Sequence, residues 1–137
     1  MRLLAQLDRD LQSQQHLSLA EFGVLSALLE GGAAGVRMTV LAERSMLSKS
    51  RLSHCVDRLE KDGFVKREPS HNDRRGLLAV LTDDGRERIL AVESAHLASV
   101  RRYVIDVLSP EELVSMGGSA DRIVDAIESA VENESDA

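Results

Sequence analysis

The sequence predicts a mainly α-helical chain that carries one small β-hairpin. Apolar residues recur at helical spacing through most of the 137 residues, and two short apolar runs around a polar loop interrupt that pattern near the middle. Hydrophobic residues make up 43% and charged residues 29% of the chain, which is typical of a folded domain and excludes a disordered one. Because the only aromatic residues are Phe22, Phe64 and Tyr103, we expect a core of Leu, Val, Ala and Ile.

Local signals mark the first two helices. Four leucines recur at helical spacing within the first fifteen residues, which predicts a short amphipathic helix: Leu3, Leu4, Leu7 and Leu11. Ser18 is followed three residues later by Glu21, the pattern of a capping box at the start of a second helix. Gly31 and Gly32 are expected to end that helix.

Two further helices follow at close spacing. We expect Thr39 to cap a short helix and, after a brief turn, Ser48 to cap a longer helix over 49–61, with Gly63 at its C-terminal cap position. One side of the longer helix is apolar: Leu52, Cys55, Val56 and Leu59. The opposite side is polar: Lys49, Ser50, Arg51, Ser53, His54, Asp57 and Arg58.

A hairpin and two more helices complete the chain. Segments 64–68 and 77–81 are expected to be strands around the polar loop 70–76. Asp83 and Asp84 favour the start of a helix that runs to about residue 108 and is apolar on two sides. Ser109 and Pro110 begin a last helix. Its Gly117-Gly118 pair predicts a kink or a close backbone contact.

The charge is unevenly distributed along the chain. Residues 37–76 carry ten basic and six acidic side chains, a net charge of +4, whereas residues 1–36 and 77–137 carry net charges of −2 and −8. The total is −6, which by itself argues against nucleic acid as a partner. A basic middle between acidic flanks instead favours nucleic-acid binding by the middle segment alone.

The middle segment has the organisation of a winged helix-turn-helix. A short helix, a tight turn and a longer polar-sided helix are followed by a hairpin with Arg74 and Arg75 at its tip. An α-helix fits the major groove of DNA, and a thin basic loop can enter the narrower minor groove. Two alternatives remain: the polar side of the helix is an ordinary solvated surface, and Arg58 pairs with Asp62 four residues on.

Several segments, taken together, resemble the multiple antibiotic resistance regulator (MarR) family. They are residues 19–28, 41–43, 56–67, 73–75 and 81–85, which read LAEFGVLSAL, LAE, VDRLEKDGFVKR, DRR and LTDDG. Their order and the short distance between the last two carry the resemblance, which covers nearly the whole chain. It implies a winged helix-turn-helix domain over 17–84 and a helical dimerisation region formed by 1–16 and 85–137.

The resemblance also implies a function and a set of contacts. Family members are homodimeric transcription regulators, most often repressors, that bind a pseudo-palindromic operator in double-stranded DNA, and many respond to an aromatic or phenolic small molecule. The helix over 48–61 is then the recognition helix, and its implied DNA contacts are Ser48, Lys49, Ser50, Arg51, Ser53, His54 and Arg58. On the hairpin tip, Arg75 matches the minor-groove arginine, Asp73 the acid that orders the wing, and Arg74 a phosphate contact.

Other chemistry finds little support in the sequence. The single cysteine, Cys55, lies on an apolar stripe and is expected to be a small buried hydrophobe rather than a thiol sensor. The four histidines lack metal-ligand spacing, and we expect His96 and Tyr103 to be packing residues. No motif indicates an enzyme or a cofactor, no apolar run is long enough to span a membrane, and we expect a cytoplasmic protein.

The sequence leaves one alternative function open. The acidic total charge is compatible with a winged-helix module that binds another protein and has no affinity for DNA.

Overall fold

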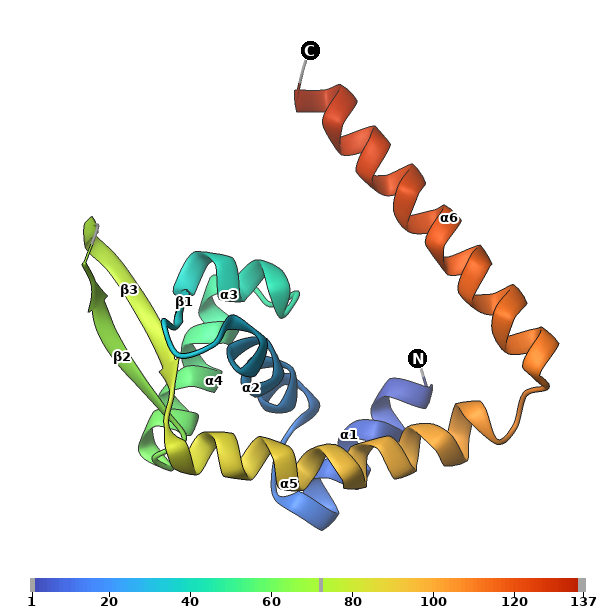
Figure 1. The fold of residues 1–137 in the computed structure, drawn as a ribbon, viewed down its shortest axis with the longest axis horizontal. Helices are drawn as coiled ribbons and strands as arrows, with labels where there is room; N and C mark the ends of the chain where they lie inside the picture. Colours follow the sequence, from blue (N-terminus) through green and yellow to red (C-terminus); the bar gives the residue numbers. More distant parts are fainter. Residues whose placement is uncertain (1, 72, 136–137) are drawn as a thin grey trace. The chain divides into compact units, whose positions relative to one another are not determined.

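The computed structural model describes the backbone of residues 2–71 and 73–135, and the side chains of residues 2–71 and 76–131. The chain divides into two compact units, one up to Ser99 and one from Val100 onward. The first unit contains five α-helices and a three-stranded antiparallel sheet, and the second is helical (Figure 1). The predicted fold class, mainly α-helical with a small hairpin, is confirmed.

The first two helices form where the sequence predicts them. Helix α1 spans Arg2–Gln15 and α2 spans Leu19–Gly31. The capping box is confirmed: the Ser18 hydroxyl accepts the Glu21 N–H at 3.2 Å, and the Glu21 carboxylate accepts the Ser18 N–H at 2.8 Å. Gly32 ends α2 with φ of +72°, a left-handed conformation that glycine adopts without a steric penalty.

The next two helices are joined by a tight turn. Helix α3 spans Met38–Arg44 and α4 spans Lys49–Lys61. The Ser48 hydroxyl accepts the Arg51 N–H at 3.2 Å, as predicted. The expectation for Thr39 is wrong, because the N-cap lies two residues earlier, at Arg37, which makes no side-chain cap bond, and α3 starts at Met38. Strand pairing just before α3 fixes this earlier start.

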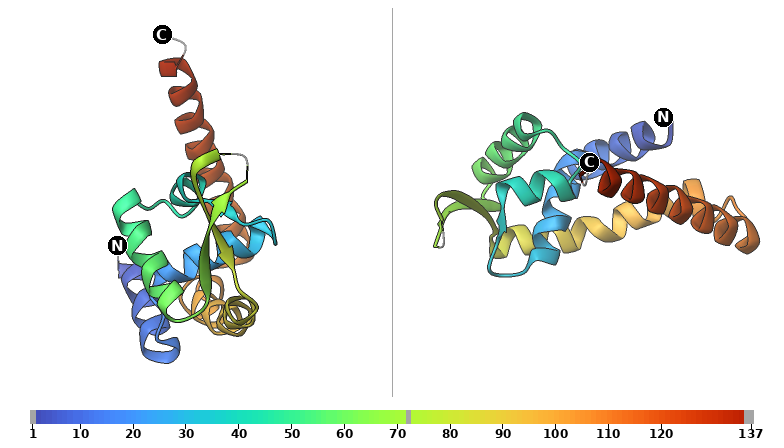
Figure 2. Two further views of the ribbon diagram at one scale, coloured as in Figure 1. Left: turned by 90° about the vertical axis from the view of Figure 1, so that its left-hand side faces the viewer. Right: turned by 90° about the horizontal axis from the view of Figure 1, so that it is seen from above.

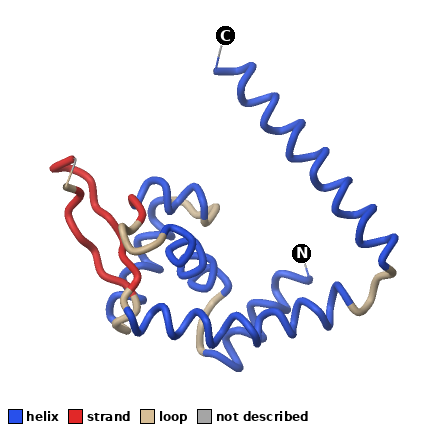
Figure 3. Tube along the Cα trace, in the orientation of Figure 1, coloured by secondary structure: helices blue, strands red, loops and turns tan. Residues whose placement is uncertain are grey.

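The sheet is larger than the predicted hairpin. Strands β1 (Val36–Arg37), β2 (Val65–Ser70) and β3 (Asp73–Leu81) are arranged in the order β1-β3-β2, so the segment expected to be a polar loop is mostly strand. Pro69 fits inside β2 because β2 lies at an edge of the sheet, where a missing N–H leaves no partner unpaired. Figure 3 shows the strands confined to this hairpin and to short β1 beside the helices.

A single aliphatic core holds the first unit together, as the composition predicts. Its largest fully buried side chains come from α2, α3, α4, β2 and α5: Leu25, Leu28, Leu41, Leu52, Leu59, Ile89, Val24, Val56, Val65 and Val92. Burying one such side chain stabilises the fold by about 1.5–3 kcal/mol. Among the described residues, Glu21 is the one charged side chain in the buried class, and it is 3% exposed.

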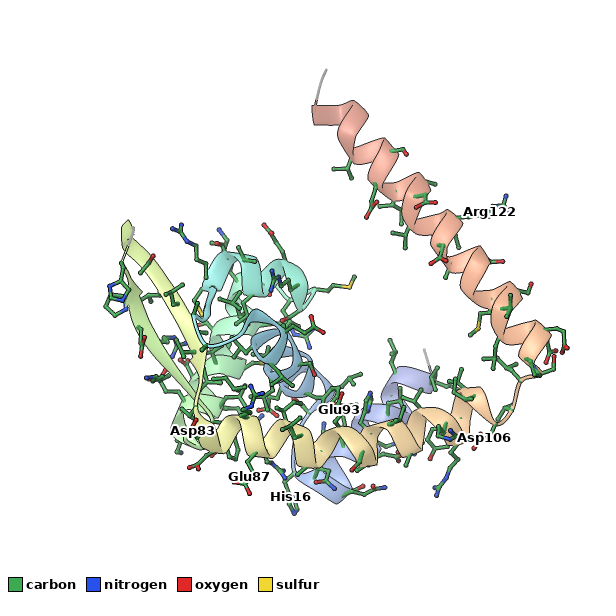
Figure 4. The ribbon with its side chains drawn as sticks, viewed as in Figure 1. His16, Asp83, Glu87, Glu93, Asp106 and Arg122 are labelled. Atoms are coloured by element: carbon green, nitrogen blue, oxygen red, sulfur yellow. The ribbon has the colours of Figure 1, made fainter. Side chains whose placement is uncertain are left out.

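Helix α5 (Asp83–Val100) is anchored at both ends, and Figure 4 marks Asp83 at its start. In its first turn, the Thr82 hydroxyl accepts the Gly85 N–H at 3.0 Å and donates to the Gly63 carbonyl at 2.7 Å. Further along, the Ser99 hydroxyl donates to the Asp10 carboxylate at 2.9 Å, which ties α5 to α1.

The second unit contains a π-helical stretch, η1 (Arg101–Ile105), and α6 (Pro110–Ser135). The long helix expected to reach residue 108 is therefore α-helical to Val100, becomes π-helical at Arg101 and ends at Ile105. The start of α6 is as predicted, since the Ser109 N–H donates to the Glu112 carboxylate at 2.8 Å. Among the described residues, no atom lies within 4 Å of a Cβ built at Gly117 or Gly118, so no close backbone contact is found there.

Helix α6 is amphipathic, and its apolar side is exposed. Six large apolar side chains along it are at least half exposed: Val114, Met116, Ile123, Val124, Ile127 and Val131. Over residues 2–71 and 73–135, no helix is both long enough and apolar enough to cross a membrane.

Candidate nucleic-acid interface

Helix α4 presents its polar side to solvent because its opposite side is fixed in the core. Leu52, Val56 and Leu59 are each at most 1% exposed. The predicted contact residues lie on the other side, where Ser53 is half-buried and six are exposed: Ser48, Lys49, Ser50, Arg51, His54 and Arg58. Their donors and cations are therefore available to an external partner.

The wing, which we define as the β2–β3 hairpin, projects away from the helices of the first unit (Figure 1). The turned views of Figure 2 show its two strands twisting about each other. The register pairs Ser70 with Asp73, so the predicted wing residues form the start of β3 next to the apex. The side chains of Asp73, Arg74 and Arg75 lie outside the described residues, and their predicted roles stay predictions.

Arg58 has a partner that the sequence did not indicate. Its Nε atom forms an ion pair with the Glu21 carboxylate at 3.2 Å, and its side chain remains 69% exposed while that of Glu21 is 4% exposed. The partner found is therefore Glu21, and not Asp62, which the spacing within α4 leaves open as an alternative. Glu21 thus connects the start of α2 to α4.

Arg67 on β2 is a charged residue that the sequence analysis did not single out. Its guanidinium donates to Asp57 at 2.7 Å, to Glu60 at 2.9 Å and to the Ser53 carbonyl at 3.3 Å. The side chain is 22% exposed. Burial acts to lower the pKa of Arg67, but the hydrogen bonds and charges of the two carboxylates outweigh it and raise that pKa above its ordinary value. This cluster joins the wing to α4.

A hollow of about 380 Å³ lies between the start of α3, α4 and the wing. Arg37, Thr39 and Ser53 contribute polar groups to it, and Leu77 contributes apolar surface. It opens beside the polar side of α4, so the surface is concave between the two elements expected to contact DNA.

A second hollow, of about 300 Å³, is lined by Gln12, His16, Ser18 and Arg58. It is therefore lined by α1, by the α1–α2 connection and by α4; His16 is labelled in Figure 4. His96 behaves as a packing residue, because its ring lies against that of Phe22 in a tilted arrangement, with centroids 4.4 Å apart and an angle of 44° between the planes. Burial lowers the pKa of His96 below 6.5.

Two other expectations concern reactive groups. Cys55 is half-buried and packs against the core, and burial raises the pKa of its thiol, which favours the unreactive protonated form. Within the part of the chain that the structure describes, no group of three His, Cys, Asp or Glu side chains is placed to hold a metal ion.

Comparison with known proteins gives consistent results. The model of the MarR family matches residues 17–77. The transcriptional regulator PecS of Dickeya dadantii (strain 3937) is 34% identical over 99 residues, which cover 72% of this chain and 57% of PecS. The chain thus spans a little over half the length of this curated relative.

Two solved structures match more of the chain. AbsC, a MarR family transcriptional regulator from Streptomyces coelicolor, is 41% identical with a TM-score of 0.84, and the match covers 93% of this chain and 86% of AbsC. Sco3205, a MarR family transcriptional regulator from the same organism solved in complex with DNA, is 38% identical with a TM-score of 0.85. That match covers 91% of this chain and 78% of Sco3205.

Proposed function

Because the chain belongs to the MarR family of transcriptional regulators, we propose that it is a homodimeric repressor that binds a short inverted repeat in double-stranded DNA. The observation that carries the proposal is the exposed polar side of α4 beside the projecting wing, in the one segment of the chain with a net positive charge. The DNA-bound state of the similar Sco3205 supports it.

In this proposal, α4 lies in the major groove. Lys49, Arg51 and His54 can reach base edges and phosphates from its exposed side, and Ser48 and Ser50 can bond phosphates. Ser53 and Arg58 are further candidates on the same helix. At the wing, Arg75 enters the minor groove, Arg74 contacts a phosphate and Asp73 orders the hairpin.

The exposed apolar side of α6 supports dimerisation. Val114 is 77% exposed and Ile123 is 61% exposed, and a continuous apolar stripe on a helix normally packs against a partner. A second copy of the chain supplies a matching stripe. Acidic residues also outnumber basic ones over 110–135, which keeps this helix away from the phosphates.

A small aromatic or phenolic effector is part of the proposal. The hollow lined by His16 and Arg58 has a volume of about 300 Å³, which is in the range of small-ligand sites. Arg58 belongs to α4, so a ligand there contacts the recognition helix directly. To change DNA affinity, the ligand must prefer one arrangement of the two recognition helices over another.

Selection of bound genomic DNA fragments with the purified protein tests the central part of this proposal. We expect enrichment of an inverted repeat whose half-sites are about 10 base pairs apart, because two recognition helices of a dimer meet successive turns of the major groove. Enrichment of an unrepeated site, or of nothing, contradicts the proposal.

The alternative, a protein-interaction module without DNA affinity, makes a different prediction. A DNA-binding winged helix retains weak affinity for random duplex at low salt, whereas the module shifts no duplex in a gel at any salt concentration.

A further inference from the structure

Arg67 engages both acidic residues of α4. The helix contains two acidic side chains, Asp57 and Glu60, against four basic ones. The two Arg67 amino groups each reach one of these carboxylates, at 2.7 and 2.9 Å, and the amino group on Asp57 also reaches the Ser53 carbonyl. Arg67 of β2 is therefore bonded to both acidic side chains of the recognition helix, α4.

These acids lie where a negative charge harms DNA binding. Ser53, Asp57 and Glu60 follow one another at helical spacing along the side of α4 that meets the wing. The Asp57 side chain is 59% exposed and that of Glu60 is 43% exposed. Unpaired, both would repel phosphates of a duplex that contacts the polar side of α4 and the wing.

We infer that Arg67 screens Asp57 and Glu60 from the DNA phosphates and is a positioning residue of the interface, not a DNA contact. The inference rests on the proposed DNA binding. Its physical basis is that three of the five N–H donors of the Arg67 guanidinium are bonded within the protein, and that the two carboxylates offset its charge. The same bonds hold the wing strand against α4, so the two DNA-facing elements keep one relative placement.

Arginine suits this role better than lysine does. The planar fork presents several donors in fixed directions, which matches three acceptors on successive turns of one helix. A lysine ammonium is a point charge on a flexible stem and cannot reach Asp57 and Glu60 with two separate groups. We therefore expect R67K to be intermediate between the wild type and R67Q.

The test measures the affinity of the 137-residue chain for its selected operator by fluorescence anisotropy at about 0.1 M salt. Wild type, R67Q, D57N/E60Q and R67Q/D57N/E60Q form a mutant cycle. K66Q is the matched control, because it removes one positive charge from the same strand, and Lys66 pairs with Glu68 within that strand. If the wild type binds no DNA, the proposed function fails before the inference is tested.

Screening predicts a specific order of affinities. R67Q should bind about tenfold more weakly than the wild type and more weakly than K66Q, because it exposes two negative charges to the phosphates. Neutralising the two acids in the R67Q background should restore affinity to within about threefold of the wild type. A purely structural role for Arg67 predicts no such rescue.

A direct phosphate contact predicts the opposite result. In that case R67Q/D57N/E60Q binds as weakly as R67Q, which overturns the inference.

If R67Q alone does not fold, as judged by circular dichroism, D57N/E60Q and R67Q/D57N/E60Q are compared with each other. Their affinities should agree within about threefold, since Arg67 has no charge left to screen, and a larger difference overturns the inference.

Discussion

Replacing Gly85 by alanine is expected to destabilise the chain strongly, because at this glycine α5 lies close to the backbone that connects α4 to β2. A Cβ built at Gly85 lies 2.9 Å from the Leu81 Cδ1 atom and 2.9 Å from the Phe64 carbonyl carbon, and closer still to the Phe64 carbonyl oxygen. The carbonyl cannot swing aside, because its oxygen accepts the Thr82 N–H at 3.0 Å.

The size of the effect follows from the kind of atom that must move. Overpacking against side chains costs about 1–3 kcal/mol, and at Gly85 the main obstacle is hydrogen-bonded backbone, so we expect about 3 kcal/mol. For a chain of this length, that loss lowers the melting temperature by about 10 °C. Gly23 is the matched control: nothing lies within 4 Å of its Cβ position inside α2, and G23A should raise stability by about 0.5–1 kcal/mol.

The assay is urea unfolding followed by circular dichroism, because the chain has no tryptophan. Wild type, G85A and G23A are compared at equal protomer concentration, since association contributes to apparent stability. The reasoning is refuted if G85A unfolds within about 0.5 kcal/mol of the wild type, or if the two variants change stability by similar amounts.

Three further predictions concern the Ser48 cap, the half-buried His96 and the exposed apolar stripe of α6. S48A should lower the free energy of unfolding by about 1 kcal/mol through loss of the Arg51 N–H bond, and an unchanged urea midpoint would count against that cap. The pKa of His96 is lower in the folded state than its ordinary 6.5. His96 therefore binds a proton more readily in the unfolded chain than in the folded chain. The stability of the wild type relative to H96Q should therefore fall as pH decreases through about 6.5, and parallel stability curves would contradict this. I127E should dissociate the proposed dimer in sedimentation measurements while the neighbouring E128Q does not, and a dimeric I127E would exclude this stripe as the interface.

Features encoded within a few residues could be predicted from the sequence. The caps at Ser18, Ser48 and Ser109 are all confirmed, because a capping side chain and the N–H it accepts lie three residues apart. The apolar side of α4 is likewise set by spacing within one helix, and it fixes which residues face solvent. Thr39 is the exception, since strand pairing of Arg37 with β3 determines where α3 begins.

Features that depend on distant pairing could not be predicted. Strand β1 has two residues and leaves no periodic pattern, and the wing extends into solvent, so its polar strands resemble a loop. The Glu21–Arg58 and Arg67–Asp57 pairs join separate elements, and a sequence gives the charge of each residue without its partner. This is why the spacing within α4 offers Arg58 only the local alternative Asp62, and why the sequence indicates no partner for Arg67.

The most direct test of the central claim is a hydroxyl-radical footprint of the selected operator with the wild-type protein and with R75A. The claim is that two copies of α4 and the wing contact one duplex. The wild type should protect two patches related by a two-fold axis and about one helical turn apart, with flanking minor-groove protection that R75A loses. A single protected patch, or flanks equally protected by both proteins, would contradict the claim.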